Sequence, residues 1–247
     1  MRVVGVSELD RLLFVRHQLD PDLVLGAWQL DEAAAVVSHR PIAREMLTVL
    51  AGFGPAADQA RLLAGLADEI DPPHRLTLTA PVDVVPDRWR LDDVRHWHWM
   101  LTRTRPSDEV PDAVVVDDAA AIDALLDVGA PDSHARPGTP GIEAWLGLRD
   151  GDALVAVGAV VRNPDGSGHL RGVTVAPHAR GRGLGRSLSV ALTRQALRGP
   201  GIASLGVYAD NVPALRMYRG LGYEVVHEFR SGRVSGSSST TAVAPSR

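Results

Sequence analysis

The feature that most constrains this chain is a turn, ARGRGLGRSL at residues 179–188, which leads from an apolar segment into a helical one. Three arginines and three glycines stand in these ten positions. Glycine lets another molecule approach the backbone closely and tolerates unusual dihedral angles. A helix that begins at Gly183 or Leu184 would direct its free N–H groups and its positive dipole end at that molecule. The turn therefore predicts a site for a phosphate-bearing ligand.

The segments around the turn predict a regular succession of strands and helices. Residues 169–177 form an apolar run that ends at a proline, which is typical of a strand. Leucine and alanine at helical spacing follow the turn as far as Gly199. By the same signals we expect a strand at 112–118, a helix at 119–130, a hairpin at 142–163 that turns at Asp150-Gly151-Asp152, a strand at 202–209, a helix at 211–221 and a strand at 222–230.

Residues 1–105 predict a separate N-terminal domain that is rich in helices. Apolar residues recur there at helical spacing in three segments, RLLFVRHQL (11–19), EAAAVV (32–37) and AREMLTVLAGF (43–53). RLTLTAP (75–81) alternates instead, as a strand does. The tryptophans and histidines of residues 88–101 favour a helix or strand packed at a domain interface.

Two polar segments divide the chain. Residues 102–112 are polar and contain proline, so we place a boundary there, between a domain at 1–105 and a second domain at 106–231. Residues 232–247 are rich in serine, glycine and threonine, a composition that predicts a disordered tail.

Composition excludes several classes of function. The chain has no cysteine, hence no disulfide, no thiol nucleophile and no cysteine-based zinc site, and we expect no metal. A net charge of −4 argues against a nucleic-acid partner. No apolar run approaches the ~20 residues of a membrane span, and the N-terminus lacks the apolar core of a signal peptide. We therefore expect a cytoplasmic protein with no membrane partner.

Three kinds of glycine-rich phosphate site compete for the turn. All 26 basic residues are arginine, so the lysine of a P-loop is missing. A dinucleotide-binding fingerprint needs a third glycine, but Arg186 and Leu188 stand at the places where one would fall after Gly181 and Gly183. The strand that follows also carries no carboxylate for a ribose. Neither alternative fits the sequence.

The third kind fits. Arg180, Gly183 and Gly185 match R/Q-x-x-G-x-G/A, and the stretch VTVAPHARGRGLGRSL resembles the acyl-coenzyme A signature of the GNAT N-acyltransferase superfamily. LGVYADNVPALRMYRGLGYEVV is similar to the later strand–helix–strand of that family. The resemblance covers roughly residues 110–231. It implies an α/β fold of the GNAT type, with a mixed, mostly antiparallel central sheet flanked by helices.

The resemblance also implies which residues bind acetyl-CoA, the acyl donor. The turn would hold the pyrophosphate, and the strand before it would bind the pantetheine arm and supply an amide as oxyanion donor. Asn211, which the sequence independently predicts as a helix N-cap, would touch the same arm. The implied binding residues are Val173, Thr174, Val175, Arg180, Gly181, Arg182, Gly183, Leu184, Gly185, Arg186, Ser187 and Asn211.

Candidates for proton transfer are fewer. The resemblance assigns Tyr218 as the acid that protonates the departing thiolate, with a core tyrosine as the alternative. An alkylamine is mostly protonated at neutral pH, so a base is also needed. The strand HLRGVTV offers no carboxylate, which leaves Glu143 and His169 as candidates, each with a structural role as its alternative.

The expected function is therefore transfer of an acyl group, by default acetyl, from coenzyme A to a primary amine by direct attack in a ternary complex. A non-catalytic acyl-CoA sensor or scaffold is the alternative. The C-terminal half resembles the glycine N-acyltransferase-like branch, in which a degenerate copy precedes an active one, so residues 1–105 are either such a copy or an independent helical module. The acceptor stays open, and a homodimer is common in the family.

Overall fold

The structure, a computed structural model, describes residues 1–42 and 45–235. Residues 1–102, the N-terminal half, contain β1 (Arg2–Val3), α1 (Leu13–Gln18), β2 (Val24–Leu30), β3 (Ala33–Ile42), β4 (Glu45–Phe53), α2 (Ala56–Glu69), β5 (Arg75–Leu78) and β6 (Leu91–Thr102). Residues 114–234, the C-terminal half, contain β7 (Val114–Val115), α3 (Ala119–Gly129), β8 (Ile142–Asp150), β9 (Ala153–Arg162), β10 (Gly168–Val175), α4 (Leu184–Ala196), β11 (Ala203–Tyr208), α5 (Val212–Arg219) and β12 (Glu224–Val234).

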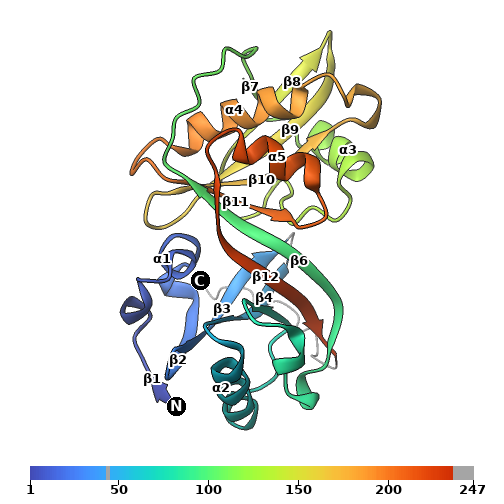
Figure 1. Ribbon diagram of the computed structural model, residues 1–247. Helices are drawn as coiled ribbons and strands as arrows, with labels where there is room; N and C mark the ends of the chain where they lie inside the picture. Colours follow the sequence, from blue (N-terminus) through green and yellow to red (C-terminus); the bar gives the residue numbers. More distant parts are fainter. Residues whose placement is uncertain (43–44, 236–247) are drawn as a thin grey trace, which may run out of the picture.

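The twelve strands of the described residues join one mixed sheet in the order β1-β2-β3-β4-β5-β12-β6-β11-β10-β9-β8-β7. Pairing is antiparallel except for β4 with β5 and β10 with β11, whose connections run through α2 and α4. This is the mixed, mostly antiparallel α/β architecture of the GNAT fold that the resemblance implies for residues 106–231. It also extends through residues 1–102, where six strands and two α-helices stand in place of the predicted helix-rich domain. The long central strands β6 and β12 cross between the two halves in Figure 1.

The two halves exchange their last strands. β6 closes the N-terminal half in sequence but pairs with β11 of the C-terminal half, while β12 pairs with β5. The two exchanged strands also pair with each other at the centre of the sheet. The sheet therefore runs without a break past the predicted boundary at 105/106.

Two segments predicted as helices are strands. Residues 33–37 of EAAAVV lie in β3 and EMLTVLAGF forms β4, while residues 43–44 of the predicted helix lie outside the described residues. In β3, Ala34 and Val36 pack into one core cluster while Ala33, Ala35 and Val37 pack into another. Because both faces of this strand are buried, the polar positions that would reveal alternation are missing, and an unbroken apolar run resembles a buried helix. RLLFVRHQL does contain a helix, α1, and RLTLTAP contains β5.

In the C-terminal half the predicted elements are confirmed in order. The hairpin β8–β9 turns at Gly151, whose φ of 58° suits glycine. The predicted tail begins too early, since residues 232–234 belong to β12. There Gly232 and Arg233 pair with β5 and Val234 is 3% exposed. The rest of the predicted tail, from 236 onward, lies outside the described residues.

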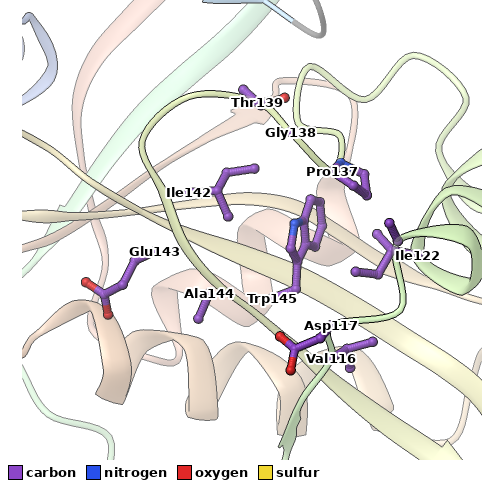
Figure 2. A pocket seen from close by; sticks show the side chains of 11 residues that line it. Val116, Asp117, Ile122, Pro137, Gly138, Thr139, Ile142, Glu143, Ala144 and Trp145 are labelled. Atoms are coloured by element: carbon purple, nitrogen blue, oxygen red, sulfur yellow. The ribbon is translucent and has the colours of Figure 1, made fainter.

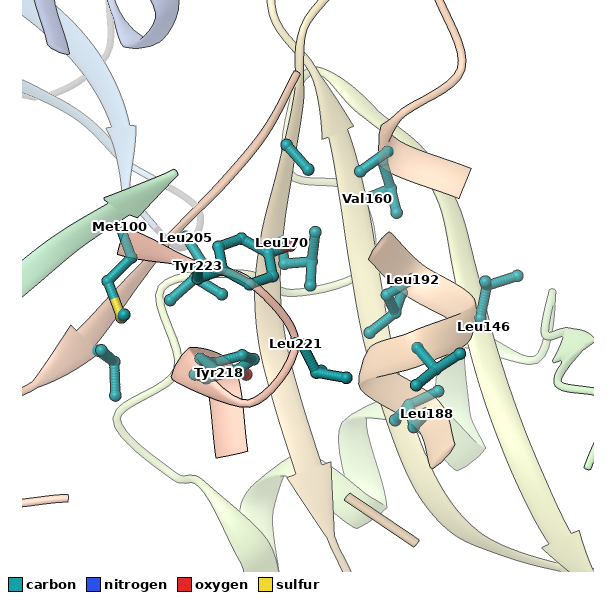
Figure 3. Close-up of a cluster of buried hydrophobic side chains, with 14 of the residues drawn as sticks. Met100, Leu146, Val160, Leu170, Leu188, Leu192, Leu205, Tyr218, Leu221 and Tyr223 are labelled. Carbon is teal, nitrogen blue, oxygen red and sulfur yellow. The ribbon is translucent and has the colours of Figure 1, made fainter. Parts of the chain in front are cut away.

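Three larger clusters hold these elements together. α4 and α5 pack Leu188, Leu192 and Tyr218 against one face of the C-terminal half, as Figure 3 shows. α1 covers the opposite face near the centre, where Phe14 lies against Trp99 and Phe229. α2 covers β3–β5 of the N-terminal half. Among the described residues, none of the helices has both the length and the apolar character that crossing a bilayer requires.

Candidate functional site

The site is built where two parallel strands separate. β10 and β11 pair only from Gly168 with Ala203 to Leu170 with Leu205, although β10 continues to Val175. Between Arg171 and Thr174 the register of β10 against β9 shifts, and Gly172 takes a φ of 60° there. The bulge turns the end of β10 away from β11. A strand edge is thereby left open along Val173–Val175.

An open strand edge offers backbone N–H and C=O groups to an extended ligand. Thr174 adds a buried hydroxyl, for which no hydrogen-bond partner is present in the part of the chain that the structure describes. On the other face Val173 and Val175 pack beside the core under α4. The predicted segment 173–175 is thus placed to bind an extended, amide-containing arm.

The glycine-arginine turn lies directly beyond this edge. Gly181 and Gly183 both have a φ of 78°, and a Cβ at either position would meet nothing within 4 Å. Gly183 is the N-cap of α4, and the Ser187 amide donates to its carbonyl as the helix begins. The first amides of a helix have no intrahelical acceptor. Within residues 1–42 and 45–235, no acceptor is found for the amides of 181–186. They form a cradle that suits a pyrophosphate.

The arginine side chains of the turn bind protein groups. Arg180 donates to the carbonyls of Val175 and Gly129, at 3.3 and 3.2 Å. Arg182 pairs with Asp150 across 2.8 Å. Arg186 pairs with Asp108, and that hydrogen bond lowers the pKa of the Asp108 carboxyl. These contacts are largely exposed, and exposed ion pairs stabilise little. The arginines can therefore exchange them for a phosphate.

α5 brings the other predicted residues to the same opening. Asn211 caps this helix, and its side chain accepts a hydrogen bond from the Ala214 amide. Tyr218 is buried in the cluster that also contains Leu170 and Leu205, the last pair before the strands separate. Its ring lies 5.6 Å from that of Tyr223 (Figure 3). Burial raises the pKa of Tyr218, so its phenol carries a proton at neutral pH.

Glu143 lies elsewhere. It accepts hydrogen bonds from Arg162 and Gln195, and Arg162 also donates to the carbonyls of Ala196 and Arg198 at the C-terminal end of α4. The turn stands at the opposite end of the same helix. The hydrogen bond from Arg162 lowers the pKa of Glu143, which makes it a weaker base. The structure does not bring Glu143 together with Tyr218.

Glu143 borders a shallow hollow instead. The hollow has a volume of about 310 Å³ and is lined by β8, the start of α3 and the loop at 137–139 (Figure 2). It faces the outer β7–β8 edge of the sheet. It is therefore separate from the opening between β10 and β11.

His169 is nearer to the opening but is chemically constrained. It is 6% exposed, and its Nδ1 lies 2.9 Å from the Ser204 hydroxyl. Burial, followed by the fields of Arg171 and Arg40, holds the pKa of His169 well below its ordinary value. It is neutral at pH 7 and a weak base. No group of three or more His, Asp or Glu that could hold a metal occurs among the residues described.

The sequence pointed to the turn but not to the separation of the strands. The only signal for the latter is Gly172, an isolated glycine within a strand pattern, which is typical of a bulge. No sequence signal points to Arg171, which lies beside the bulge, or to Arg40 on β3 in the other half, because neither residue belongs to a motif.

Comparison with known proteins agrees with this geometry. The model of the Acetyltransferase (GNAT) family matches residues 92–223, which is more than half of the chain. A mycothiol acetyltransferase from Saccharopolyspora erythraea is 39% identical over 80 residues, which are 32% of this chain and 26% of that protein. The matched region is thus about a quarter of the length of that relative.

Solved structures share the fold over nearly the whole chain. An acetyltransferase of the GNAT family from Colwellia psychrerythraea has a TM-score of 0.57 at 14% identity, covering 95% of this chain and 99% of its own. A GCN5-related N-acetyltransferase from Kribbella flavida has a TM-score of 0.52 at 18% identity, covering 96% and 98%. At such identities the likeness establishes the fold alone, and it includes the N-terminal half.

Proposed function

Since this chain belongs to the Acetyltransferase (GNAT) family, we propose that it transfers an acetyl group from acetyl-CoA to a primary amine. The observation that carries the proposal is that the open edge of β10 leads directly into the glycine-arginine turn. The open edge of β10 suits the pantetheine arm, and the amides of 181–186, where that edge ends, suit the pyrophosphate. Acetyl-CoA has both groups in the same order.

The roles follow from the placement of the groups. Val173 and Val175 supply the backbone amides that face away from β9, of which one stabilises the oxyanion that forms on the thioester carbonyl. The unprotonated amine nitrogen attacks that carbonyl, the C–S bond breaks, and Tyr218 gives its proton to the departing thiolate. The proton that the amine loses passes through solvent to the tyrosinate, which restores the acid. The chain has no cysteine for a covalent relay, so attack is direct. Glu143, at the far end of α4, has no part in this scheme.

We also propose that the N-terminal half is a second, degenerate copy of the same fold. Two features support this. In both halves antiparallel strands lead into a parallel pair through a helix, β2-β3-β4-α2-β5 and β8-β9-β10-α4-β11. Each half then continues into a strand that pairs with the other half. The proposal predicts one acetyl-CoA site per chain.

A sensor that binds acyl-CoA without turnover is the second candidate. It is favoured by one observation, that no carboxylate stands on the open segment 171–175. Retention of a buried, protonated tyrosine beside the opening favours the enzyme.

The test is calorimetric titration with acetyl-CoA. We expect micromolar binding with one site per chain, and at least a 100-fold weaker affinity in the double variant Arg182→Glu/Gly183→Asp, which places two carboxylates in the phosphate cradle. Gly201→Asp is the matched control, because Gly201 also has a positive φ, 72°, and open space around it. No binding by the wild-type protein would refute both candidates. Binding with no turnover of any amine would leave the sensor.

A further inference from the structure

Two arginines, one from each half, lie on the same face of the sheet, and no counterion for them occurs within residues 1–42 and 45–235. Arg40 lies on β3 and Arg171 on β10, and the charge of each acts on the same buried His169. Neither makes a hydrogen bond or an ion pair with any residue in the described part of the chain. After burial, the field of Arg171 lowers the pKa of Arg40. The chain as a whole carries a net charge of −4, so the pair is not the result of a basic surface.

Both side chains point to the sheet face opposite α4. In β10 the side chain of Leu170 packs under α4, so that of its neighbour Arg171 leaves the sheet on the other face. In β3 the side chains of alternate residues point to the same face, so Arg40 points to the same side as Ala34 and Val36, which pack under α1. The guanidinium carbon of Arg40 lies 5.9 Å from the centre of the Phe14 ring. The two halves thus bring both arginines to the sheet face opposite α4, where Arg40 lies beside α1.

Such an arrangement is unfavourable without an anion. Both arginine residues are half-buried, and burial lowers the pKa of each. Charges taken from water are normally paired in proteins, because an uncompensated one destabilises the fold. Here two like charges share one place. A carboxylate or phosphate between them would offset both penalties at once, and guanidinium groups bind such anions in a forked geometry.

The position of the pair relates it to the reaction. Arg171 is the last residue of β10 before the bulge, where the strand parts from β11. Across the opening, Gly206 of β11 has no side chain, and a Cβ there would stand 3.3 Å from the ring of Trp97. A ligand held by the arginines would therefore lie over this aromatic floor, at the mouth of the opening and on the face away from α4.

The ionisable residues around Arg40 and Arg171 leave a net positive charge at this site. Partial desolvation, followed by the fields of Arg171 and Arg75, lowers the pKa of the exposed His134, so this histidine is neutral at pH 7 and adds hydrogen-bonding capacity without charge. Asp132 acts on His134 but not on either arginine of the pair.

We propose that Arg40 and Arg171 bind an acidic group of the acyl acceptor, so that the acceptor is an amine which also carries a carboxylate or a phosphate. The inference rests on the proposed acetyl transfer and narrows its substrate class. With the anion held at the arginines, the amine end of the acceptor extends toward the opening, where the thioester of acetyl-CoA would lie. Both halves of the chain are then required for acceptor binding.

The test compares amines that differ only in the acid. Amino acids are assayed beside their decarboxylated amines, for example leucine beside 3-methylbutylamine, and O-phosphoethanolamine beside ethanolamine. We expect at least a 10-fold higher kcat/KM for the acid-bearing member of a productive pair, mostly through KM. In Arg40→Gln and Arg171→Gln this preference should fall below 3-fold. Arg61→Gln is the matched control, because Arg61 is exposed and already paired with Asp31 and Asp58.

A second readout needs no turnover. Acetate and phosphate at constant ionic strength should raise the Tm of the wild-type protein and of Arg61→Gln, but not of the two other variants. Without added anion, Arg40→Gln and Arg171→Gln should melt at a higher temperature than the wild-type protein, because each removes an uncompensated charge.

The two acid types distinguish carboxylate from phosphate as the natural anion. Equal kcat/KM within every pair, or a preference and a Tm response that survive both substitutions, would overturn the inference. Because titration with acetyl-CoA is independent of the acceptor, intact acetyl-CoA binding in that case would leave the proposed function standing. Its absence would refute the proposed function instead.

Discussion

In the N-terminal half the parallel pair β4–β5 is bonded to its end, whereas in the C-terminal half the pair β10–β11 parts after three residue pairs. β4 and β5 pair through Gly52 with Leu78, and the Thr79 amide then donates to the Gly52 carbonyl. Gln59 of α2 closes the place that corresponds to the opening. Its amide donates to the Gly54 carbonyl at 2.6 Å and to the Thr79 hydroxyl at 2.9 Å.

The turns before the two helices differ in the same sense. Gly54, which precedes α2, packs closely against the backbone of Glu32, because a Cβ at Gly54 would stand 2.5 Å from the Glu32 carbonyl oxygen. Gly181 and Gly183 precede α4 with open space around them. The two halves thus share one topology. In the N-terminal half a buried glutamine and close backbone packing close the space between the parallel strands, whereas in the C-terminal half a bulge and two exposed glycines leave it open. Binding capacity resides in these local devices, since the arrangement of elements is common to both halves.

The largest effect on kcat should come from Tyr218, which lies beside the opening of the C-terminal half. Tyr218→Phe should lower kcat by 10²–10⁴-fold, the usual range for a general acid, with acetyl-CoA affinity unchanged. Steady-state kinetics and calorimetry measure the two. Tyr223→Phe is the control, because Tyr223 lies in the same cluster but shares a hydrogen bond with Thr193 at 3.0 Å.

The pH profile sharpens this prediction. Burial raises the pKa of Tyr218 from its ordinary value of 10, so the proton-donating form persists to higher pH. Wild-type kcat should therefore show no loss from this group between pH 7 and 10. A fall centred below pH 10 that disappears in Tyr218→Phe would contradict a buried acid.

The bulge that opens the strands is the next target. In Gly172→Ala a methyl group would lie 3.2 Å from the Ser133 hydroxyl at a φ of 60°, which is strained for alanine. We expect kcat/KM to fall by roughly 10–100-fold, since displaced binding groups lose alignment. Gly141→Ala is the control, because Gly141 has a φ of 79° and a Val161 side chain at 3.3 Å but lies at the start of β8. Equal losses in both variants would assign the effect to stability alone.

How far the sequence predicts this molecule depends on the signal that each element carries. The C-terminal half was predictable because its helices are amphipathic and its turns carry glycine. The turn itself was found because Arg180, Gly183 and Gly185 form a motif. β3 was not, since Ala33 to Val37 are buried on both faces and lose the alternation that marks a strand.

Long-range geometry was beyond the sequence. The arginines of the turn were expected to face a phosphate, yet Arg182 lies against Asp150, 32 residues away. Glu143 became a candidate base because it is a carboxylate near a predicted hairpin, and nothing local reveals its partner Arg162 on the next strand. Such pairs are decided by register, which small sequence signals do not specify.

Closure of the N-terminal half should matter for stability and not for activity. Gln59→Ala leaves the Gly54 carbonyl and the Thr79 hydroxyl without their donor, and unpaired buried polar groups cost roughly 1–3 kcal/mol. For a chain of this size that corresponds to a fall in Tm of about 2–4 °C per kcal/mol. Acetyl-CoA should still bind at one site per chain. A second site in Gln59→Ala would show that the glutamine alone keeps the half closed.

The smallest effect is expected at Glu143, the carboxylate of the open half that lies away from its opening. In Glu143→Gln we expect kcat to change by less than 3-fold, because the side chain serves to fix Arg162 at the end of α4. Its pKa is lowered in the folded state, so its contribution to stability is present above pH 4.5 and is lost as pH falls through the lowered value. The difference in Tm between the variant and the wild-type protein should therefore shrink below pH 4.5. Gln195→Ala, which removes the other donor to Glu143, should have a similarly small effect on kcat. A 100-fold loss of kcat in Glu143→Gln at unchanged Tm would instead make Glu143 the missing base, and the opening between β10 and β11 would no longer contain the whole of the chemistry.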